Sequence, residues 1–238
     1  MSFRHDPVIA LSIAAALTVP VILARAATAS GVVAGFLHAA WFAWEGGLET
    51  VLAFVALVAL GVAATRAGRA RKEAFGAAQT GGGRRAARHV MANATPAALF
   101  LVAGAIWPWL SGLARAGACA ALAGSLADTV GGEIGMLSPE RPRMLLFGAP
   151  VTRGVDGGMT FSGLAASAAA AALVATVVRL AGGVPFVATL VGGLAGSVGD
   201  SILGATVERA GKLGNEGVNF WSSLAAGATG AGCAWVLG

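Results

Sequence analysis

Residues 122–133 read LAGSLADTVGGE, a run of small apolar residues that carries the acids Asp128 and Glu133. Residues 194–205 read LAGSVGDSILGA and place Asp200 at the same position of a similar phrase. Small residues allow helices to approach closely in a membrane, whereas an ionised carboxylate at that depth is costly without a partner. The two stretches therefore predict membrane helices that carry functional acids.

The composition of the whole chain supports a location in the membrane. Of its 238 residues, 57% are hydrophobic and 11% are charged, whereas about a quarter of the residues in a soluble domain are charged. The net charge of +5 does not indicate nucleic-acid binding, because tyrosine is absent and most basic residues lie in short loops. Cys119 and Cys233 lie far apart in apolar segments, so they predict neither a disulfide framework nor a metal site.

The apolar segments predict an all-α fold, a polytopic transmembrane helical bundle of about six to eight spans that forms one integral membrane domain over residues 1–238. The expected spans are 7–25, 29–45, 47–65, 91–107, 108–131, 158–181, 184–207 and 217–237.

Three polar loops, at 66–90, 132–157 and 208–216, then fall on one side of the membrane and hold 12 of the 16 Lys and Arg residues. The positive-inside rule makes this side cytoplasmic. We therefore expect a multi-pass protein, of the cytoplasmic membrane if the source is prokaryotic, whose soluble ligands bind at the cytoplasmic face.

The two acid-bearing phrases predict a parallel internal repeat. The pattern GSxxD at 124–128 recurs at 196–200, and both segments run from outside to inside in the expected topology. Positions four apart share one face of a helix, so Asp128 and Asp200 each lie on a stripe of glycines. Two glycine stripes can pack against each other, which would bring the two aspartates close together.

These acids suit a divalent cation. Asp128 and Asp200 lie near the cytoplasmic C-terminal ends of their helices, where the helix dipole favours positive charge. Mg²⁺ takes one or two carboxylates plus phosphate oxygens. Glu133 lies about 140° from Asp128 on an ideal helix, and we expect a helix break at Gly131–Gly132 that turns Glu133 inward. The alternative is a structural acid, paired with an arginine or capped by the serine of the same phrase.

Two loops carry residues that suit phosphate binding. The stretch RGVDGGMT (153–160) allows a compact turn whose backbone amides point at an anion, with Thr160 near a helix start; a plain turn into a helix is the alternative. The stretch ERAGKLGNEGVN (208–219) combines basic side chains that neutralise phosphate with asparagines that bind metal-bound water or a base edge. Its alternative is a purely topological role, which is also the favoured interpretation of the basic residues at 84–89.

Taken in order along the chain, several stretches resemble the transmembrane protein 19 family, which includes the plant chloroplast phytyl-phosphate kinase. They are ADTVGGEIGMLS (127–138), RPRMLLFGAPVTRGVDGGMTFSG (141–163), GSVGDSILGAT (196–206) and Asn215-x-x-x-Asn219, and residues 29–67 and GRRAARHVMAN (83–93) also fit. The resemblance implies a multi-pass kinase that converts an isoprenyl monophosphate into its diphosphate with a nucleoside triphosphate as donor. The stretch GDSILGATVERAGK is also similar to CTP-dependent polyprenol kinases, which makes CTP a candidate donor.

The chain departs from the pattern of this family at three positions. Gly132 stands where the family commonly has Ser before Glu, Leu146 replaces a Thr, and Val155 replaces a Thr. Lost hydroxyls in a phosphate-facing loop imply an altered choice of donor or acceptor, or weaker activity.

The resulting hypothesis is a kinase in which Asp128, Asp200 and Glu133 hold Mg²⁺ on the donor phosphates. Basic side chains and the 154–158 turn neutralise the phosphoryl groups, and the prenyl tail lies between small-residue helices. The partners are an isoprenyl phosphate lipid and a nucleoside triphosphate, without nucleic acid. The expected substrate- and phosphate-binding residues are Asn93, Arg143, Gly154, Asp156, Gly157, Gly158, Thr160, Ser197, Glu208, Lys212, Asn215 and Asn219.

Two other classes of function stay open at this stage. In a transporter, the paired acids would form a cation or proton path through the bundle. In a different enzyme that acts on lipid head groups, such as a nucleotidyltransferase, the same site would release pyrophosphate.

Overall fold

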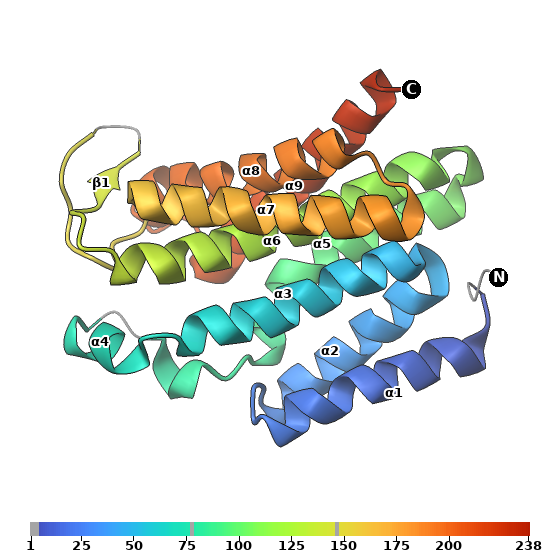
Figure 1. The fold of residues 1–238 in the computed structure, drawn as a ribbon, viewed down its shortest axis with the longest axis horizontal. Helices are drawn as coiled ribbons and strands as arrows, with labels where there is room; N and C mark the ends of the chain where they lie inside the picture. The colour runs from blue at the N-terminus through green and yellow to red at the C-terminus, as the bar shows by residue number, and fades with distance from the viewer. Residues whose placement is uncertain (1–4, 77–78, 146–147) are drawn as a thin grey trace.

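The computed structural model describes residues 5–76, 79–145 and 148–238 as an all-α bundle (Figure 1). Its helices are α1 (Pro7–Leu23), α2 (Ala29–Trp41), α3 (Leu48–Arg66), α4 (Arg69–Ala74), α5 (Ala87–Ile106), α6 (Ser111–Leu137), α7 (Phe161–Gly182), α8 (Phe186–Leu203) and α9 (Asn215–Val236). The π-helical turns η1 (Phe42–Gly46) and η4 (Gly204–Glu208) extend α2 and α8, and the 3₁₀ turns η2 (Thr80–Gly83) and η3 (Pro108–Leu110) precede α5 and α6. The strand β1 (Arg143–Met144) pairs antiparallel with β2 (Gly158–Met159).

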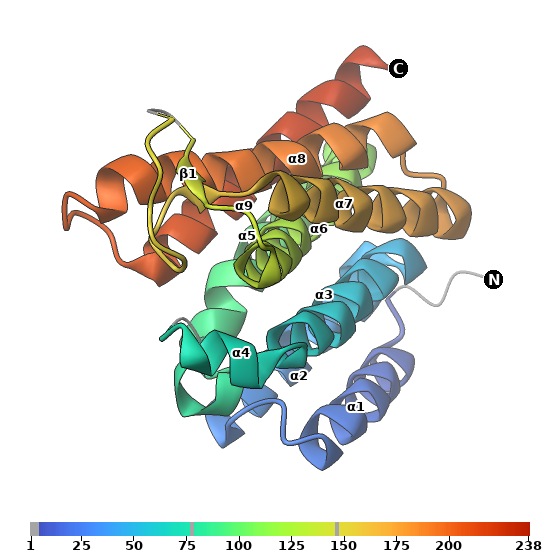
Figure 2. The ribbon, with the colours of Figure 1, turned by 60° about the vertical axis from the view of Figure 1, so that its left-hand side comes forward.

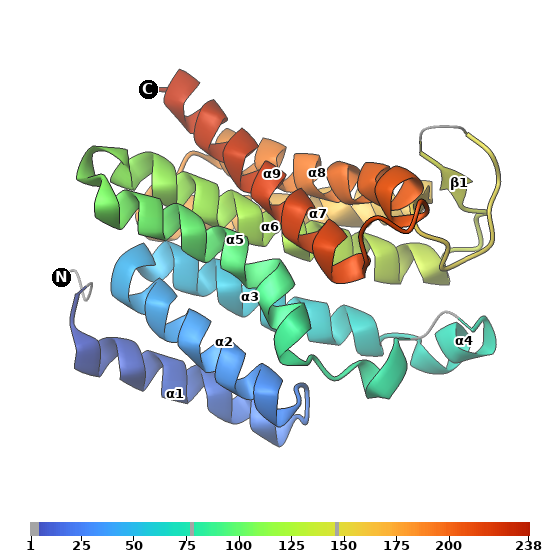
Figure 3. The ribbon, with the colours of Figure 1, turned by 180° about the vertical axis from the view of Figure 1, so that it is seen from behind.

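The helices form a multi-pass membrane bundle, as the sequence predicts. By length and composition, α3, α5, α6 with η3, α7, and α8 with η4 can each cross a membrane, and α1 is a shorter apolar helix. The polar connections α4, β1–β2 and the turn before α9 gather at one end of the bundle, whereas α1 begins and α9 ends at the other (Figures 1 and 3). We call these the loop end and the far end.

Helix α6 is the centre of the bundle. It packs against α3, α5, α7, α8 and α9, which surround it when the bundle is viewed from two sides (Figures 1 and 2). Every residue from Ala116 to Ala127 is buried. These residues are mostly Ala and Gly, whose small side chains let the neighbouring backbones approach closely.

The predicted helix break at Gly131–Gly132 is wrong. Helix α6 continues without interruption to Leu137. Gly131 is buried against α7, where an added Cβ would meet the Ser167 side chain and would lie 3.0 Å from the Gly163 carbonyl oxygen. This glycine therefore serves close packing between two helices.

The starts of α5 and α7 are fixed by side-chain caps. Helix α5 begins at Ala87, before the predicted start at 91, and His89 Nδ1 accepts a hydrogen bond from the Ala86 amide at 3.0 Å. Helix α7 begins directly after Thr160, whose hydroxyl accepts from the Gly163 amide at 3.0 Å. The predicted position of Thr160 near a helix start is therefore confirmed, and an N-cap of this kind satisfies one of the free amides of the first turn.

The α1–α2 hairpin packs on the outside of the bundle, with α2 against α5 (Figure 3). Its turn pairs with the segment before α5, because the Arg85 amide donates to the Ala26 carbonyl and the Thr28 amide donates to the Arg85 carbonyl, each at 3.0 Å. Gly31 lies against this pairing, where an added Cβ would collide with the Arg85 carbonyl oxygen. The hairpin is thus joined to the loop end through the backbone of Arg85.

Candidate functional site

The two GSxxD phrases meet at their glycines. An added Cβ on Gly196 of α8 would lie 2.9 Å from the Cα of Gly124 on α6. One helical turn further along, the side chains of Asp128 and Asp200 lie within hydrogen-bonding reach of each other. The packing of the glycine stripes and the pairing of the aspartates are confirmed, while the internal repeat as such stays a prediction.

Asp128 lines a polar cavity of about 130 Å³ at the loop end. On α6, Asp128, Gly132 and Met136 are four residues apart, so they share one face of the helix. The other walls come from α5, α9 and the segment before α5. The residues that line the cavity are Gln79, Arg85, His89, Ala92, Asn93, Asp128, Thr129, Gly132, Glu133, Met136, Asn215, Glu216 and Asn219.

Asn93 lines this polar cavity and carries a buried side-chain oxygen that has no partner among the described residues. Its Nδ2 donates to the His89 carbonyl at 2.8 Å, which fixes the orientation of the amide. Its Oδ1 is buried and has no hydrogen-bond partner within the described residues. An unpaired buried acceptor costs free energy, so Asn93 Oδ1 is a strained polar group next to the cavity.

Arg85 supplies positive charge to the polar cavity. Its Nη2 donates to the Thr65 hydroxyl at 3.3 Å. Burial lowers the pKa of the Arg85 guanidinium from its ordinary value, whereas the nearby carboxylates of Glu133 and Asp128 act in the opposite direction. Because an arginine stays protonated in proteins, the cavity keeps a cation beside its acids.

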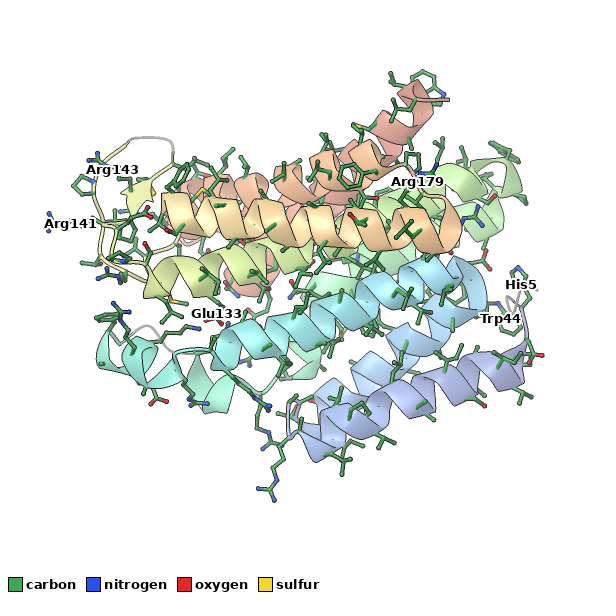
Figure 4. All side chains as sticks on the ribbon, viewed as in Figure 1. His5, Trp44, Glu133, Arg141, Arg143 and Arg179 are labelled. Carbon is green, nitrogen blue, oxygen red and sulfur yellow. The ribbon has the colours of Figure 1, made fainter. Side chains whose placement is uncertain are left out.

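Both carboxylate oxygens of Glu133 already have partners, although Glu133 lines the polar cavity. Lys72 Nζ lies 2.6 Å from Oε2, and Gln79 Nε2 donates to Oε1 at 3.0 Å. Lys72 Nζ also donates to the Ala64 carbonyl at 2.8 Å. Figure 4 shows Glu133 at the loop end, between α6 and α3. Glu133 therefore reaches the polar cavity without a helix break. Its ion pair with Lys72 links α4 to α6.

Asp200, which pairs with Asp128 but does not line the cavity, lies near further acids. The Ser222 hydroxyl donates to Asp200 Oδ2 at 3.1 Å, and the carboxylates of Asp156 and Glu208 lie near enough to act on each other electrostatically. Over the described ranges, no group of three or more His, Cys, Asp or Glu side chains is arranged to hold a metal ion.

The glycine-rich loop before α7 braces the end of α8. Gly154 and Gly157 have φ angles of +81° and +77°, which favour glycine. An added Cβ on Gly157 would lie 2.6 Å from the Ala205 Cβ in η4. The Gly158 amide donates within the turn, to the Val155 carbonyl at 3.0 Å. The loop thus holds Asp156 next to the end of α8, and the amide of Gly158 is already engaged.

Of the twelve predicted substrate- and phosphate-binding residues, only Asn93, Asn215 and Asn219 line the polar cavity. The other nine do not: Arg143, Gly154, Asp156, Gly157, Gly158, Thr160, Ser197, Glu208 and Lys212. Arg143 lies at the outer edge of the loop, where its Nη1 donates to the Gly148 carbonyl at 3.0 Å (Figure 4). Lys212 is exposed in the turn before α9. Ser197 is buried between helices, with its hydroxyl 3.0 Å from that of Ser167.

Helix α9 contributes Asn215 and Asn219, both of which line the polar cavity as the sequence predicts. Glu216 joins them and forms an ion pair with Arg88 of α5, with Nε 2.9 Å from Oε1. Sequence reasoning missed the other lining side chains and their neighbour Lys72. The signal for Arg85 and His89 is the basic cluster at 84–89, for which contact with lipid phosphates is the less favoured of two interpretations and a topological role the favoured one. These missed residues are Lys72, Gln79, Arg85, His89, Thr129 and Glu216.

The departures from the family pattern fall at different places. An added Cβ on Gly132 would meet no atom within 4 Å, so the position that commonly holds Ser has free space at the polar cavity. Val155 lies in the loop turn that precedes Asp156. Leu146 lies outside the described residues.

A second, apolar cavity of about 320 Å³ adjoins the polar one. It lies between the α1–α2 hairpin, α3 and α5. Four residues line both cavities: Arg85, His89, Asn93 and Thr129. The site as a whole therefore has a charged compartment at the loop end and an apolar compartment that extends into the bundle.

This fold and this site define a multi-pass, all-α integral membrane protein with a polar site at one end of its bundle. The chain belongs to the family described as Integral membrane protein DUF92, which it matches over residues 12–227.

The chain is similar to an uncharacterized membrane protein of Methanocaldococcus jannaschii, with 31% identity over 187 residues that cover 77% of this chain and 76% of the relative. It is also similar to an uncharacterized membrane protein of Synechocystis, with 30% identity over 181 residues, 74% of this chain and 68% of the relative. Protein PGR of Arabidopsis thaliana is 36% identical over 98 residues, 35% of this chain and 34% of that protein. No solved structure matches the chain.

Proposed function

We propose that this protein is a membrane-embedded kinase that converts an isoprenyl monophosphate of the phytyl or geranylgeranyl type into its diphosphate. The donor is a nucleoside triphosphate, with CTP as the candidate. The observation that carries the proposal is the polar cavity, which is lined by Asp128, Asn93 and Arg85 and whose Asp128 is paired with Asp200. The adjoining apolar cavity favours a lipid phosphate over a soluble one, and the resemblance to the transmembrane protein 19 family supplies the reaction.

The reaction requires little covalent chemistry from the protein. An oxygen of the lipid monophosphate attacks the γ-phosphorus of the donor, the bond from that phosphorus to the β,γ-bridging oxygen breaks, and the nucleoside diphosphate leaves. A phosphate monoester carries nearly two negative charges at neutral pH because its second pKa is about 6. The attacking oxygen therefore needs no general base, and catalysis depends on positioning and charge neutralisation.

The residues present fit Mg²⁺. This ion takes oxygen ligands and is bound through one or two carboxylates together with substrate phosphates. Asp128 and Asp200 offer the two carboxylates, and Asp128 lines the cavity in which substrate phosphates would complete the coordination. Mg²⁺ bound there would neutralise charge on the donor phosphates.

Arg85 takes the role of binding the acceptor phosphate in this proposal. Its planar guanidinium can donate two parallel hydrogen bonds to one phosphate group, and it lines both the polar and the apolar cavity. Arg143 and Lys212, which the sequence favoured for this role, lie outside the polar cavity. Glu133 acts as a positioning residue, because Lys72 and Gln79 already occupy its oxygens.

The packing of α6 supports a kinase over a transporter. A transport path needs access to the acids from both faces of the membrane in turn. Between Asp128 and the far end, every residue of α6 from Ala116 to Ala127 is buried in the bundle. The polar cavity that Asp128 lines is at the loop end, so the structure gives Asp128 access from that end.

The proposal is tested with the purified full-length chain, phytyl or geranylgeranyl monophosphate, Mg²⁺ and each of the four nucleoside triphosphates, with the products followed by mass spectrometry. We expect lipid diphosphate and nucleoside diphosphate. Loss of one preorganised charged group costs about 10²–10³ in kcat, so Asp128→Asn should lose activity by that factor. The control is Asp6→Asn, because Asp6 caps α1 at the far end and asparagine caps equally well.

Three outcomes contradict the proposed kinase. They are no product with any pair of substrates, full activity in Asp128→Asn, and release of pyrophosphate in place of nucleoside diphosphate. The last would identify a nucleotidyltransferase. Cation flux through the protein in liposomes without nucleotide would support a transporter.

A further inference from the structure

The apolar cavity follows two antiparallel helices away from Arg85. Along α2 its wall extends from Gly31 to Ala39, and along α3 from Val62 to Phe54. Each stretch advances eight residues, which corresponds to about 12 Å at 1.5 Å per residue. The cavity therefore begins at the loop end, beside the phosphate-binding groups, and reaches towards the middle of the bundle.

Gly35 keeps the middle of this cavity open. Gly31, Gly35 and Ala39 are four residues apart and share the inner face of α2. Gly35 lines the cavity, and an added Cβ there would meet no atom within 4 Å. The space beside Gly35 is therefore available to a ligand, whereas Gly31 is already pressed against the Arg85 carbonyl.

The positive charge of Arg85, at the end of the apolar cavity that meets the polar one, favours a ligand with an anionic group. Arg85 and Asn93 line both the apolar and the polar cavity, so a cationic and an amide-bearing residue stand where the two meet. A ligand with an anionic group at one end and a hydrocarbon chain at the other satisfies both compartments at once. The backbone of Arg85 also pairs with the turn of the α1–α2 hairpin, so the wall that contacts the chain is tied to the residue that contacts the anion.

We propose that the apolar cavity holds the hydrocarbon chain of the acceptor, and that the α1–α2 hairpin, through the space at Gly35, determines which chain lengths are accepted. The identity of the anionic head group rests on the proposed function. Phe54 and Ala39 limit the chain at the deep end, and Arg85 sets the position of its phosphate.

The first test compares Gly35→Phe with Gly232→Phe. Both glycines lie on helices, and an added Cβ at either meets nothing within 4 Å, but Gly232 is exposed on α9 and does not line the cavity. For geranylgeranyl monophosphate, Gly35→Phe should lower kcat/KM by about 10- to 200-fold, the range by which an apolar pocket discriminates by size. For the five-carbon dimethylallyl monophosphate, Gly35→Phe should match Gly232→Phe. Gly35→Leu is the second variant if Gly35→Phe does not fold.

The second test needs no catalysis. A prenyl monophosphate with a photoreactive diazirine at the end of its chain is bound to the unmodified protein without nucleotide, and the labelled residues are mapped by mass spectrometry. Labels on Ala39, Phe54 or Val55 are expected, and their loss in Gly35→Phe supports the assignment. Labels confined to the outer faces of α8 and α9 would overturn it.

The two tests separate this inference from the proposed function. Labelling in the cavity without any phosphoryl transfer would support the chain site and contradict the kinase. Phosphoryl transfer in which Gly35→Phe and Gly232→Phe have the same chain-length profile would support the kinase and overturn the chain site.

Discussion

Lys72 and Glu133 form an ion pair in which the two side chains are 1% and 3% exposed, so neither charge is solvated by water. Breaking a buried pair by removal of one partner leaves an uncompensated charge and costs about 3–5 kcal/mol. Lys72→Met should therefore lower the free energy of unfolding by that amount, measured as a large drop in Tm. The double variant Lys72→Met/Glu133→Met should recover much of the loss, because two apolar side chains can replace the pair.

The control for this prediction lies on the same short helix. Arg69 and Glu73 form an ion pair with Nε 2.7 Å from Oε1, but the two side chains are 40% and 52% exposed. An exposed pair four residues apart on a helix contributes about 0.3–0.5 kcal/mol. Arg69→Met should therefore leave Tm nearly unchanged, and a loss as large as that of Lys72→Met would show that α4 itself, and not the buried pair, is the sensitive element.

The Asp128–Asp200 pair predicts opposite effects on stability and on function. Two neighbouring carboxylates repel each other when both are ionised, so Asp200→Asn should stabilise the protein in the absence of divalent cations, by about 0.5–2 kcal/mol. If the proposed Mg²⁺ site is correct, Mg²⁺ should raise the Tm of the unmodified protein, and the same variant should lose that rise. Differential scanning calorimetry with and without Mg²⁺ measures both effects. A variant that is less stable than the unmodified protein and still responds to Mg²⁺ would contradict the assignment.

The sequence predicted Asp128, Glu133 and the asparagines of the site, but it missed Glu216 and favoured a topological role for the cations. Asp128 in an apolar helix is conspicuous, because a membrane span has little reason to carry an acid. A basic residue near a span has an ordinary reason to be there, since it orients the protein. Arg85 and Lys72 differ from the surface cations in their burial, and burial depends on contacts with α3 and α6 that sequence patterns do not record.

At the scale of elements, the crossing of α6 with α8 and α9 depends on glycine. An added Cβ on Gly124 would lie 2.7 Å from the Ala226 Cβ and 3.4 Å from the Gly196 Cα. Gly124→Ala should therefore destabilise the protein by about 1–3 kcal/mol through overpacking. Gly112→Ala, on the same helix with no atom within 4 Å of the added Cβ, should be neutral or gain about 0.5–1 kcal/mol. If Gly124→Ala and Gly112→Ala had the same Tm, the close packing of α6 against α8 and α9 at Gly124 would be contradicted.

The contacts of Glu140 at the start of α7 predict that the stability of the protein depends on pH. Glu140 accepts hydrogen bonds from the Ser162 hydroxyl and from the amides of Phe161 at 2.7 Å and Ser162 at 3.2 Å. The Ser162 hydroxyl, followed by these amides, lowers the pKa of the Glu140 carboxyl from its ordinary value.

A lowered pKa in the folded state means that the cap stabilises the protein above the ordinary pKa of glutamate, about 4.3. This contribution is lost as the pH falls through the lower, folded pKa. Glu140→Gln should therefore have a lower Tm than the unmodified protein at pH 7, and the difference should shrink on acidification. The measurement is a series of thermal unfolding curves between pH 7 and pH 3. A difference that stays constant across the series would show that the carboxylate charge is not what caps α7.

The uninterrupted course of α6 through Gly131–Gly132 shows what the sequence could not predict about the helix boundaries. Gly131–Gly132 was expected to break α6, because adjacent glycines weaken a helix. In a membrane the same residues permit close packing, and Gly131 packs against Ser167 and Gly163 of α7. Which of the two effects prevails depends on whether a neighbouring helix is there to be packed against. The order and the apolar character of the helices were predictable because they depend on where the apolar runs stand along the sequence.

At the scale of the whole molecule, the distribution of charge gives the bundle a direction. The three polar loops hold 12 of the 16 Lys and Arg residues, and the structure gathers these loops at one end (Figure 1). Arg25 adds to the same end, since it lies in the turn that pairs with Arg85. Arg115, on the far side, forms an ion pair with Glu49 at 3.5 Å, which offsets its charge.

This asymmetry predicts that the loop end, with its polar site, faces the cytoplasm. The test uses two single-cysteine variants in a background that lacks Cys119 and Cys233. Lys212→Cys reports the loop end, where Lys212 is exposed, and Gly112→Cys reports the far end, where the position is exposed and has space for a side chain. In intact cells, a membrane-impermeant maleimide should label Gly112→Cys and leave Lys212→Cys unlabelled until the cells are permeabilised. The reverse pattern would place the site outside, where cytoplasmic nucleoside triphosphates do not reach it, and would contradict both the orientation and the kinase.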